Sequence, residues 1–120
     1  MKSGVVWLLL PLLLVFAPVQ ALALSEEEKI TLLVGSVRNA PEGTRFIRNG
    51  KAHDAADAAT HLERKYAKAQ SRVATAEQFI QHVASASSTT GREYLVRHPD
   101  GNTVTAAAFF MEKLRELEVK

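Results

Sequence analysis

Four histidines and a run of hydroxyl side chains are the residues of this chain whose types could do chemistry. The histidines are His53, His61, His82 and His98. Asp57 precedes His61 by four residues, so on a helix the two side chains share one face and could present two metal ligands. A zinc site needs three or four ligands with supporting hydrogen-bond partners, and the sequence identifies neither. We therefore expect no metal and no cofactor.

The hydroxyl side chains cluster between Ser85 and Thr90. A serine hydrolase would use one of them, Ser87 or Ser88, with a histidine as its base. No G-x-S-x-G motif surrounds these serines, and the local sequence does not place a histidine and an acid beside them. Serines that follow a helix commonly satisfy free carbonyl groups or form turns. A structural role is therefore the favoured interpretation of this run.

Composition excludes further classes of function. The chain has no cysteine, which rules out thiolate catalysis, thiolate metal ligands and disulfides. Its 15 Lys and Arg residues are interspersed with 13 Asp and Glu residues, and no polybasic block occurs. Nucleic-acid binding through a basic stripe is therefore not expected.

The first 23 residues have the pattern of a secretory signal peptide. Lys2 gives a positive start, and an apolar stretch follows from Val5 to Ala17 until Pro18 interrupts it. Ala21 and Ala23 then form the A-x-A arrangement that a signal peptidase accepts. An uncleaved anchor would need roughly 20 apolar residues with charged flanks on both sides. We expect cleavage after Ala23, which leaves residues 24–120 as one almost neutral domain without a stable membrane anchor.

Capping residues and apolar spacing predict the elements that position these side chains. Four helices are expected, beginning after Ser25, Asp54, Thr75 and Thr105. The expected core stripes are Ile30, Leu33, Val34 and Val37; Ala55, Ala58, Ala59, Leu62, Tyr66 and Ala69; Ala76, Phe79, Ile80 and Val83; and Ala107, Phe110, Leu114 and Leu117. Asp57, His61, Arg64 and Lys68 are expected on the solvated side of the second helix.

Short extended runs separate these helices. Asn49-Gly50 is a strong hairpin signal between residues 46–48 and 51–53, since both residues tolerate positive φ. A third strand is expected over residues 94–96, before the turn that begins at Pro99. The pattern predicts an α+β fold, a single small domain with about four helices packed on a short antiparallel sheet.

Several segments in a fixed order resemble one known family. They are F-I-R-N-G at 46–50, His53, A-A-T-H-L-E-R-K at 58–65, T-A-E-Q-F-I at 75–80 and A-S-A-S-S-T-T-G-R-E-Y at 84–94. Together they resemble the YfeK-like family of small exported bacterial proteins (DUF5329), over nearly the whole mature chain. The resemblance implies a periplasmic location. It implies no reaction, ligand or partner, because the family is one of unknown function.

The resemblance also singles out polar positions that recur in the family's pattern. They are Arg48, Asn49, His53, His61, Lys65, Ser85, Ser87, Ser88 and Tyr94. Turn and cap chemistry explains most of these residue types without a ligand, and this is the favoured explanation. In the alternative, they converge into one polar pocket. Arg48 would hold an anionic group there, the serines would donate hydrogen bonds, and His53 or His61 would titrate near neutral pH.

Three classes of function follow from the sequence. The first is a small interaction or accessory module of the cell envelope, with an unknown envelope protein as partner and Leu32 and Phe109 as candidate contacts. The alternative is a binder of a small anionic ligand or envelope fragment at a pocket near Arg48. A serine hydrolase using Ser87 or Ser88 is the third.

Overall fold

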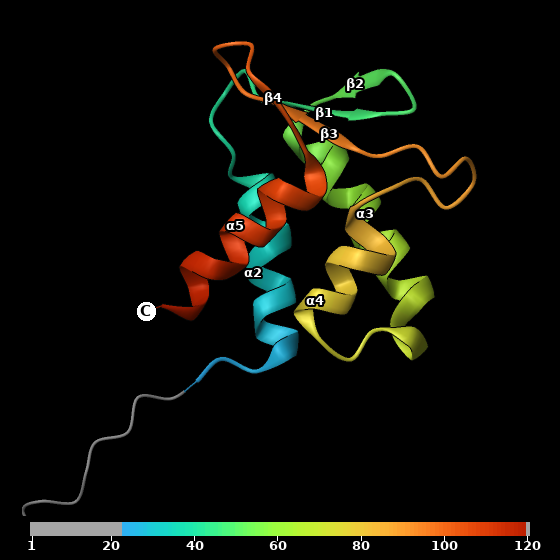
Figure 1. The fold of residues 1–120 in the computed structure, drawn as a ribbon, viewed down its shortest axis with the longest axis vertical. Helices are drawn as coiled ribbons and strands as arrows, with labels where there is room; N and C mark the ends of the chain where they lie inside the picture. Colours follow the sequence, from blue (N-terminus) through green and yellow to red (C-terminus); the bar gives the residue numbers. More distant parts are fainter. Residues whose placement is uncertain (1–22, 120) are drawn as a thin grey trace, which may run out of the picture.

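The computed structural model describes residues 23–119. The predicted signal peptide therefore lies outside the described residues, apart from Ala23. Within 23–119 the chain forms four α-helices, two further short helical segments and one four-stranded sheet (Figure 1). The helices are α2 (Glu26–Arg38), α3 (Ala55–Ala69), α4 (Ala76–Phe79) and α5 (Ala106–Glu118), with a 3-10 turn η2 (Gln70–Arg72) after α3 and a π-helical segment η3 (Ile80–Ala84) after α4. The strands are β1 (Arg45–Arg48), β2 (Lys51–His53), β3 (Leu95–Arg97) and β4 (Thr103–Thr105).

The sheet is antiparallel throughout, in the order β2-β1-β3-β4. The β1–β2 hairpin is an edge feature, as predicted, and turns at Asn49 and Gly50, whose φ angles are 51° and 79°. Positive φ at two successive positions is the geometry that favours Asn-Gly in a tight hairpin. The sheet lies across one end of the helices (Figure 1). The predicted α+β fold is confirmed.

The helices bury most residues of the stripes that their sequences predict, while Ala55, Tyr66 and Leu117 are only partly buried against the core. One position needs a correction. Ser25 caps α2 in a reciprocal capping box with Glu28, and Asp54 and Thr75 cap the two following helices through their side chains. Phe79, which is fully buried, meets Tyr66 and Phe110 edge-on at ring-centroid distances of 5.5 and 6.3 Å. The correction concerns α5, which buries Ala106 rather than Ala107 because the helix begins directly after β4.

Two local elements differ from the sequence prediction. The sequence predicts no strand between the turn at Pro99 and the last helix, whereas residues 103–105 pair with β3 as β4. The third predicted helix begins at Ala76 but changes to π-helical geometry at Ile80. Ser85, the next residue, donates its hydroxyl to the Ile80 carbonyl at 2.5 Å. This wider last turn leads into the loop that carries the serines.

The described part of the chain contains no helix long and apolar enough to cross a membrane. The apolar stretch of the predicted signal peptide lies outside the described residues.

Candidate functional site

An open pocket of about 490 Å³ lies between α3, the β1–β2 turn and the loop over residues 85–94. We call it the basic pocket, and its lining residues are Arg48, Asn49, His61, Arg64, Lys65, Lys68, Ser87, Ser88, Thr89 and Tyr94. Four of these side chains are Arg or Lys, and none is acidic. Among residues 23–119, no carboxylate lies within ion-pair distance of those four cations.

Three elements bring these residues together. The line of His61, Arg64, Lys65 and Lys68 has helical spacing of i, i+3, i+4 and i+7, so the four side chains share one face of α3. Arg48 lies at the end of β1. The β1–β2 turn and the loop over 85–94 project on the same side of the molecule in Figure 1, which brings Asn49 near the serines.

The loop is held by its own hydrogen bonds and by the hairpin turn. Ser87 is buried, and its hydroxyl oxygen accepts hydrogen bonds from the backbone N–H groups of Thr89 and Thr90 at 3.2 Å. Asn49 donates its amide to the Ser87 hydroxyl at 3.4 Å and accepts a hydrogen bond from the Thr90 hydroxyl at 2.6 Å. Ser87 therefore has the turn-forming role that the sequence favours, and it stabilises one wall of the basic pocket.

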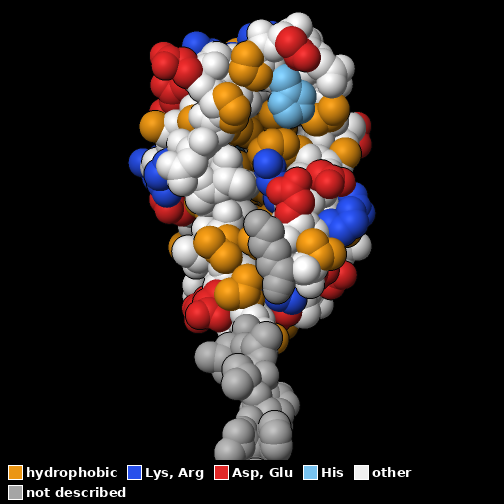
Figure 2. All heavy atoms as spheres, turned by 90° about the vertical axis from the view of Figure 1, so that its left-hand side faces the viewer, with side chains coloured by type: hydrophobic (Ala, Val, Ile, Leu, Met, Phe, Trp, Pro, Cys, Tyr) orange, Lys and Arg blue, Asp and Glu red, His pale blue; other side chains and the backbone are white. Residues whose placement is uncertain are grey.

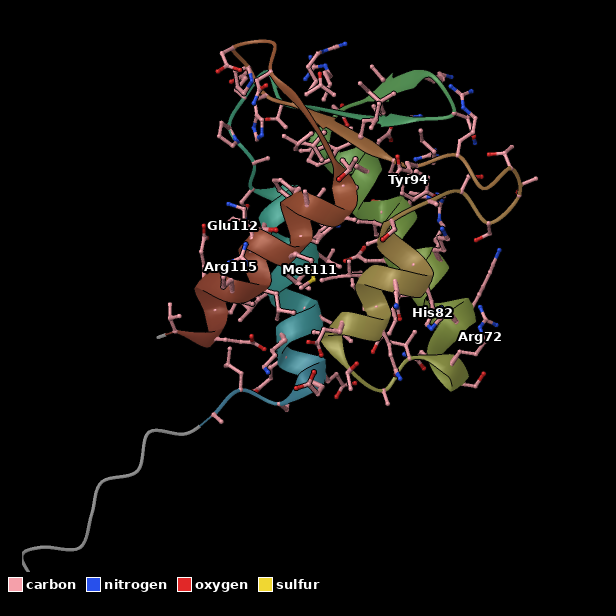
Figure 3. The ribbon with its side chains drawn as sticks, viewed as in Figure 1. Arg72, His82, Tyr94, Met111, Glu112 and Arg115 are labelled. Atoms are coloured by element: carbon pink, nitrogen blue, oxygen red, sulfur yellow. The ribbon has the colours of Figure 1, made fainter. Side chains whose placement is uncertain are left out.

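Tyr94 stands at the inner end of the basic pocket, where the loop enters β3; Figure 3 labels it. Lys65 donates to the Tyr94 hydroxyl at 3.0 Å and to the Ala86 carbonyl at 2.5 Å. His61 Nε2 lies 3.2 Å from the same hydroxyl. The hydrogen-bond partner of His61 in this pocket is thus a tyrosine, and the geometry gives no histidine base to Ser87 or Ser88.

The positive charges and partial burial change the pKa values of these groups. Burial, followed by the charges of Arg48 and Lys65, lowers the pKa of His61 to about 4. Burial and then the Arg48 charge lower the pKa of Lys65 to about 8. Burial raises the pKa of the Tyr94 hydroxyl. His61 is therefore neutral at pH 7, while Lys65 keeps its charge at pH 7 against a like-charged neighbour.

Seven of the nine polar positions that the resemblance singles out line this pocket: Arg48, Asn49, His61, Lys65, Ser87, Ser88 and Tyr94. Ser85 does not line the pocket, and its hydroxyl donates to the Ile80 carbonyl. His53 does not line the pocket either; its Nδ1 lies 3.7 Å from an Asp57 carboxylate oxygen, one turn along α3. Asp57 thus faces His53, and His61, which the sequence placed on the solvated side, is half-buried against Tyr94. Residues 23–119 contain no group of three or more His, Cys, Asp or Glu side chains placed to hold a metal ion.

Sequence reasoning missed three lining residues: Arg64, Lys68 and Thr89. The positions of Arg64 and Lys68 could have been predicted from helical spacing, since they share the helical face of His61 and Lys65. Thr89 had none, because its place depends on how the loop folds over Ser87.

Comparison with known proteins gives the family. A family model described as "Family of unknown function (DUF5329)" matches residues 24–118. The chain belongs to DUF5329. It is similar to the "Uncharacterized protein YfeK" of Salmonella typhimurium strain LT2, with 42% identity over 69 residues, or 58% of this chain and 57% of that protein. The aligned region thus spans less than two thirds of this relative, and no solved structure matches the chain. Membership in DUF5329 confirms the resemblance seen in the sequence and assigns no activity.

Proposed function

We propose that this DUF5329 protein is exported to the periplasm and binds a small anionic ligand in the basic pocket. The observation that supports this most directly is the set of four cations around one open pocket without an acidic partner among the described residues. Like charges held together are destabilising unless an anion neutralises them. An anion in the pocket would relieve that repulsion.

The remaining lining groups suit the same ligand. Arg48 offers a planar guanidinium that can bind two oxygens of a phosphate or carboxylate at once. Lys65 and Lys68 supply compact charges, and Ser88 and Thr89 supply hydroxyl donors. This combination of charged and neutral donors is the chemistry of an anion site.

Export is supported by the sequence of residues 1–23 and by the start of the family match. The family model begins at Leu24, the residue after the predicted cleavage site. The pocket would then bind its ligand in the periplasm. We expect this ligand to be a small phosphate or carboxylate compound derived from the cell envelope.

Thermal unfolding with and without inorganic phosphate tests the proposal. At a phosphate concentration ten times its Kd, binding adds about 1.4 kcal/mol to the free energy of unfolding, or roughly 6–11 °C in Tm. Phosphate also stabilises proteins generally, because it is excluded from their surfaces. The comparison is therefore between Arg48→Ala, expected to lose the specific increase, and Arg72→Ala, expected to keep it. Arg72 lies in η2, well away from Tyr94 in Figure 3. Equal increases in Tm for the two variants would contradict the proposal.

A second candidate function is that of an interaction module, and a groove on a different surface of the molecule supports it. Leu32 and Phe109 line one groove of about 430 Å³ between α2, α5 and the segment over residues 39–44. Leu32 is 44% exposed. Figure 2 views the side on which α2 and α5 lie in Figure 1 and shows hydrophobic side chains interspersed with charged ones there. Cross-linking in intact cells would test it. A protein partner lost with Leu32→Glu but kept with Arg48→Ala would support this function, and a partner kept with both would exclude this groove.

A further inference from the structure

A second, smaller hollow opens beside the basic pocket and shares three of its residues: Arg48, His61 and Tyr94. Apart from these three, its lining is entirely apolar and includes Ala58, Leu62 and Phe110. We call it the apolar hollow. It lies between the β1 and β3 strands and the ends of α3 and α5 that face the sheet.

The three shared residues are amphipathic, so their polar groups can line the basic pocket while their apolar parts line the apolar hollow. The Tyr94 hydroxyl contacts Lys65 and His61, while the Tyr94 ring is buried with the core. The aliphatic stem of an arginine and the ring of a histidine behave in the same way, with an apolar body and a polar tip. A ligand held at the cations is thus within reach of apolar surface.

We propose that the ligand is a phosphate monoester with an ester group of two or three carbons, which enters the apolar hollow. This rests on the proposed function, since the phosphate is held by the basic pocket. The four cations and the hydroxyl donors favour a doubly charged group with several terminal oxygens over a singly charged one.

The size of the apolar hollow sets the length of the ester group. Its volume is about 30 Å³, against about 490 Å³ for the basic pocket. Only a short alkyl group therefore fits, and an ester group of two or three carbons is the size that we propose. Apolar cavities of this kind are poorly hydrated and bind apolar groups.

Calorimetric titration of the mature protein with methyl, propyl and hexyl phosphate tests this. Each buried methylene strengthens binding about fourfold, so propyl phosphate should bind roughly tenfold to twentyfold more tightly than methyl phosphate. Hexyl phosphate should bind no more tightly than propyl phosphate, because the hollow is then full. Equal binding of methyl and propyl phosphate would overturn the inference and leave the proposed function standing. Absence of binding by both would overturn the two together.

Two variants test whether the apolar hollow causes the preference for propyl phosphate over methyl phosphate. Ala58 is buried in its wall, and Ala58→Val should remove the preference for propyl phosphate while methyl phosphate still binds. Ala56→Val, on the exposed face of the same helix, is the matched control and should keep the preference. If Ala58→Val does not fold, Leu95→Ala enlarges the hollow from the β3 side and should move the optimum to a longer chain. A chain-length preference unchanged by these substitutions would contradict the inference.

Discussion

Lys65 is a cation of the basic pocket whose pKa is shifted by its surroundings. Its ammonium group is held by Tyr94 and Ala86, and burial and then Arg48 lower its pKa to about 8. A bound anion favours the charged form, so binding near this pH takes up a proton. The charge of Lys65 therefore links anion binding to pH.

Sulfate binding should consequently weaken as the pH rises above about 8, by up to tenfold per pH unit. Sulfate is the suitable probe because its own charge does not change in this range. Lys65→Arg should remove the dependence, since arginine stays charged. Titration calorimetry at several pH values measures the effect. The same fall in affinity for wild type and Lys65→Arg would show that another group is responsible.

His61 makes the free energy of unfolding depend on pH in the acid range, whereas Lys65 makes anion binding depend on pH in the alkaline range. Its pKa is lowered to about 4, chiefly by burial, from 6.5. Between these values the unfolded chain binds more protons than the folded one, so the free energy of unfolding falls as the pH drops through this range. The contribution is on the order of 2–3 kcal/mol after allowance for solvent screening.

His61→Gln should therefore reduce the stability difference between about pH 7 and about pH 4.5, as measured by urea unfolding. Gln81→Ala, at an exposed residue of η3 that does not titrate, is the control and should leave that difference unchanged. If both variants keep the wild-type difference, the acid sensitivity arises elsewhere.

At the scale of elements, Asn49 has two structural roles in the β1–β2 turn. Asn49 adopts a φ of 51° and its side chain joins the hairpin to Ser87 and Thr90. Asn49→Gly keeps the backbone conformation and loses the side-chain hydrogen bonds, at a cost of about 1 kcal/mol in the free energy of unfolding. Asn49→Ala should cost about 1 kcal/mol more, because an alanine is strained at positive φ. Equal losses in urea unfolding would mean that the turn itself is not under strain.

Elements with strong local signals were predictable from the sequence. The capping box at Ser25 and the Asn49-Gly50 turn specify α2 and the hairpin through residues close in the chain. Strand β4 is different: three residues cannot show a strand period, and only its pairing with β3 defines it. The π-helical segment η3 was missed for a similar reason, since its apolar spacing reads as an ordinary helix.

The same distinction applies to the candidate site. Family resemblance singled out most of the lining residues, but their convergence depends on the tertiary contact between the hairpin turn and the loop over 85–94. The sequence also favoured a structural explanation for these positions. For Ser87 that interpretation agrees with its hydrogen bonds, while Arg48 and Lys65 line the pocket beside it.

For the molecule as a whole, the proposed export predicts where the mature protein begins. The protein isolated from the periplasm should begin at Leu24, directly before the Ser25 cap of α2. Intact mass and N-terminal sequencing measure this. Replacing Ala23 by a bulky residue, as in Ala23→Tyr, should block cleavage and retain residues 1–23. A wild-type protein that keeps these residues would instead be an anchored form.

The measurement that tests the central claim most directly is a phosphate titration of the mature protein, followed by the amide chemical shifts of each residue. The account predicts saturable shifts at Asn49, Ser88, Thr89 and Tyr94, which line the basic pocket, and their loss in Arg48→Ala but not in Arg72→Ala. Shifts that do not saturate, or that gather on the α2–α5 face around Leu32, would contradict an anion site at the basic pocket.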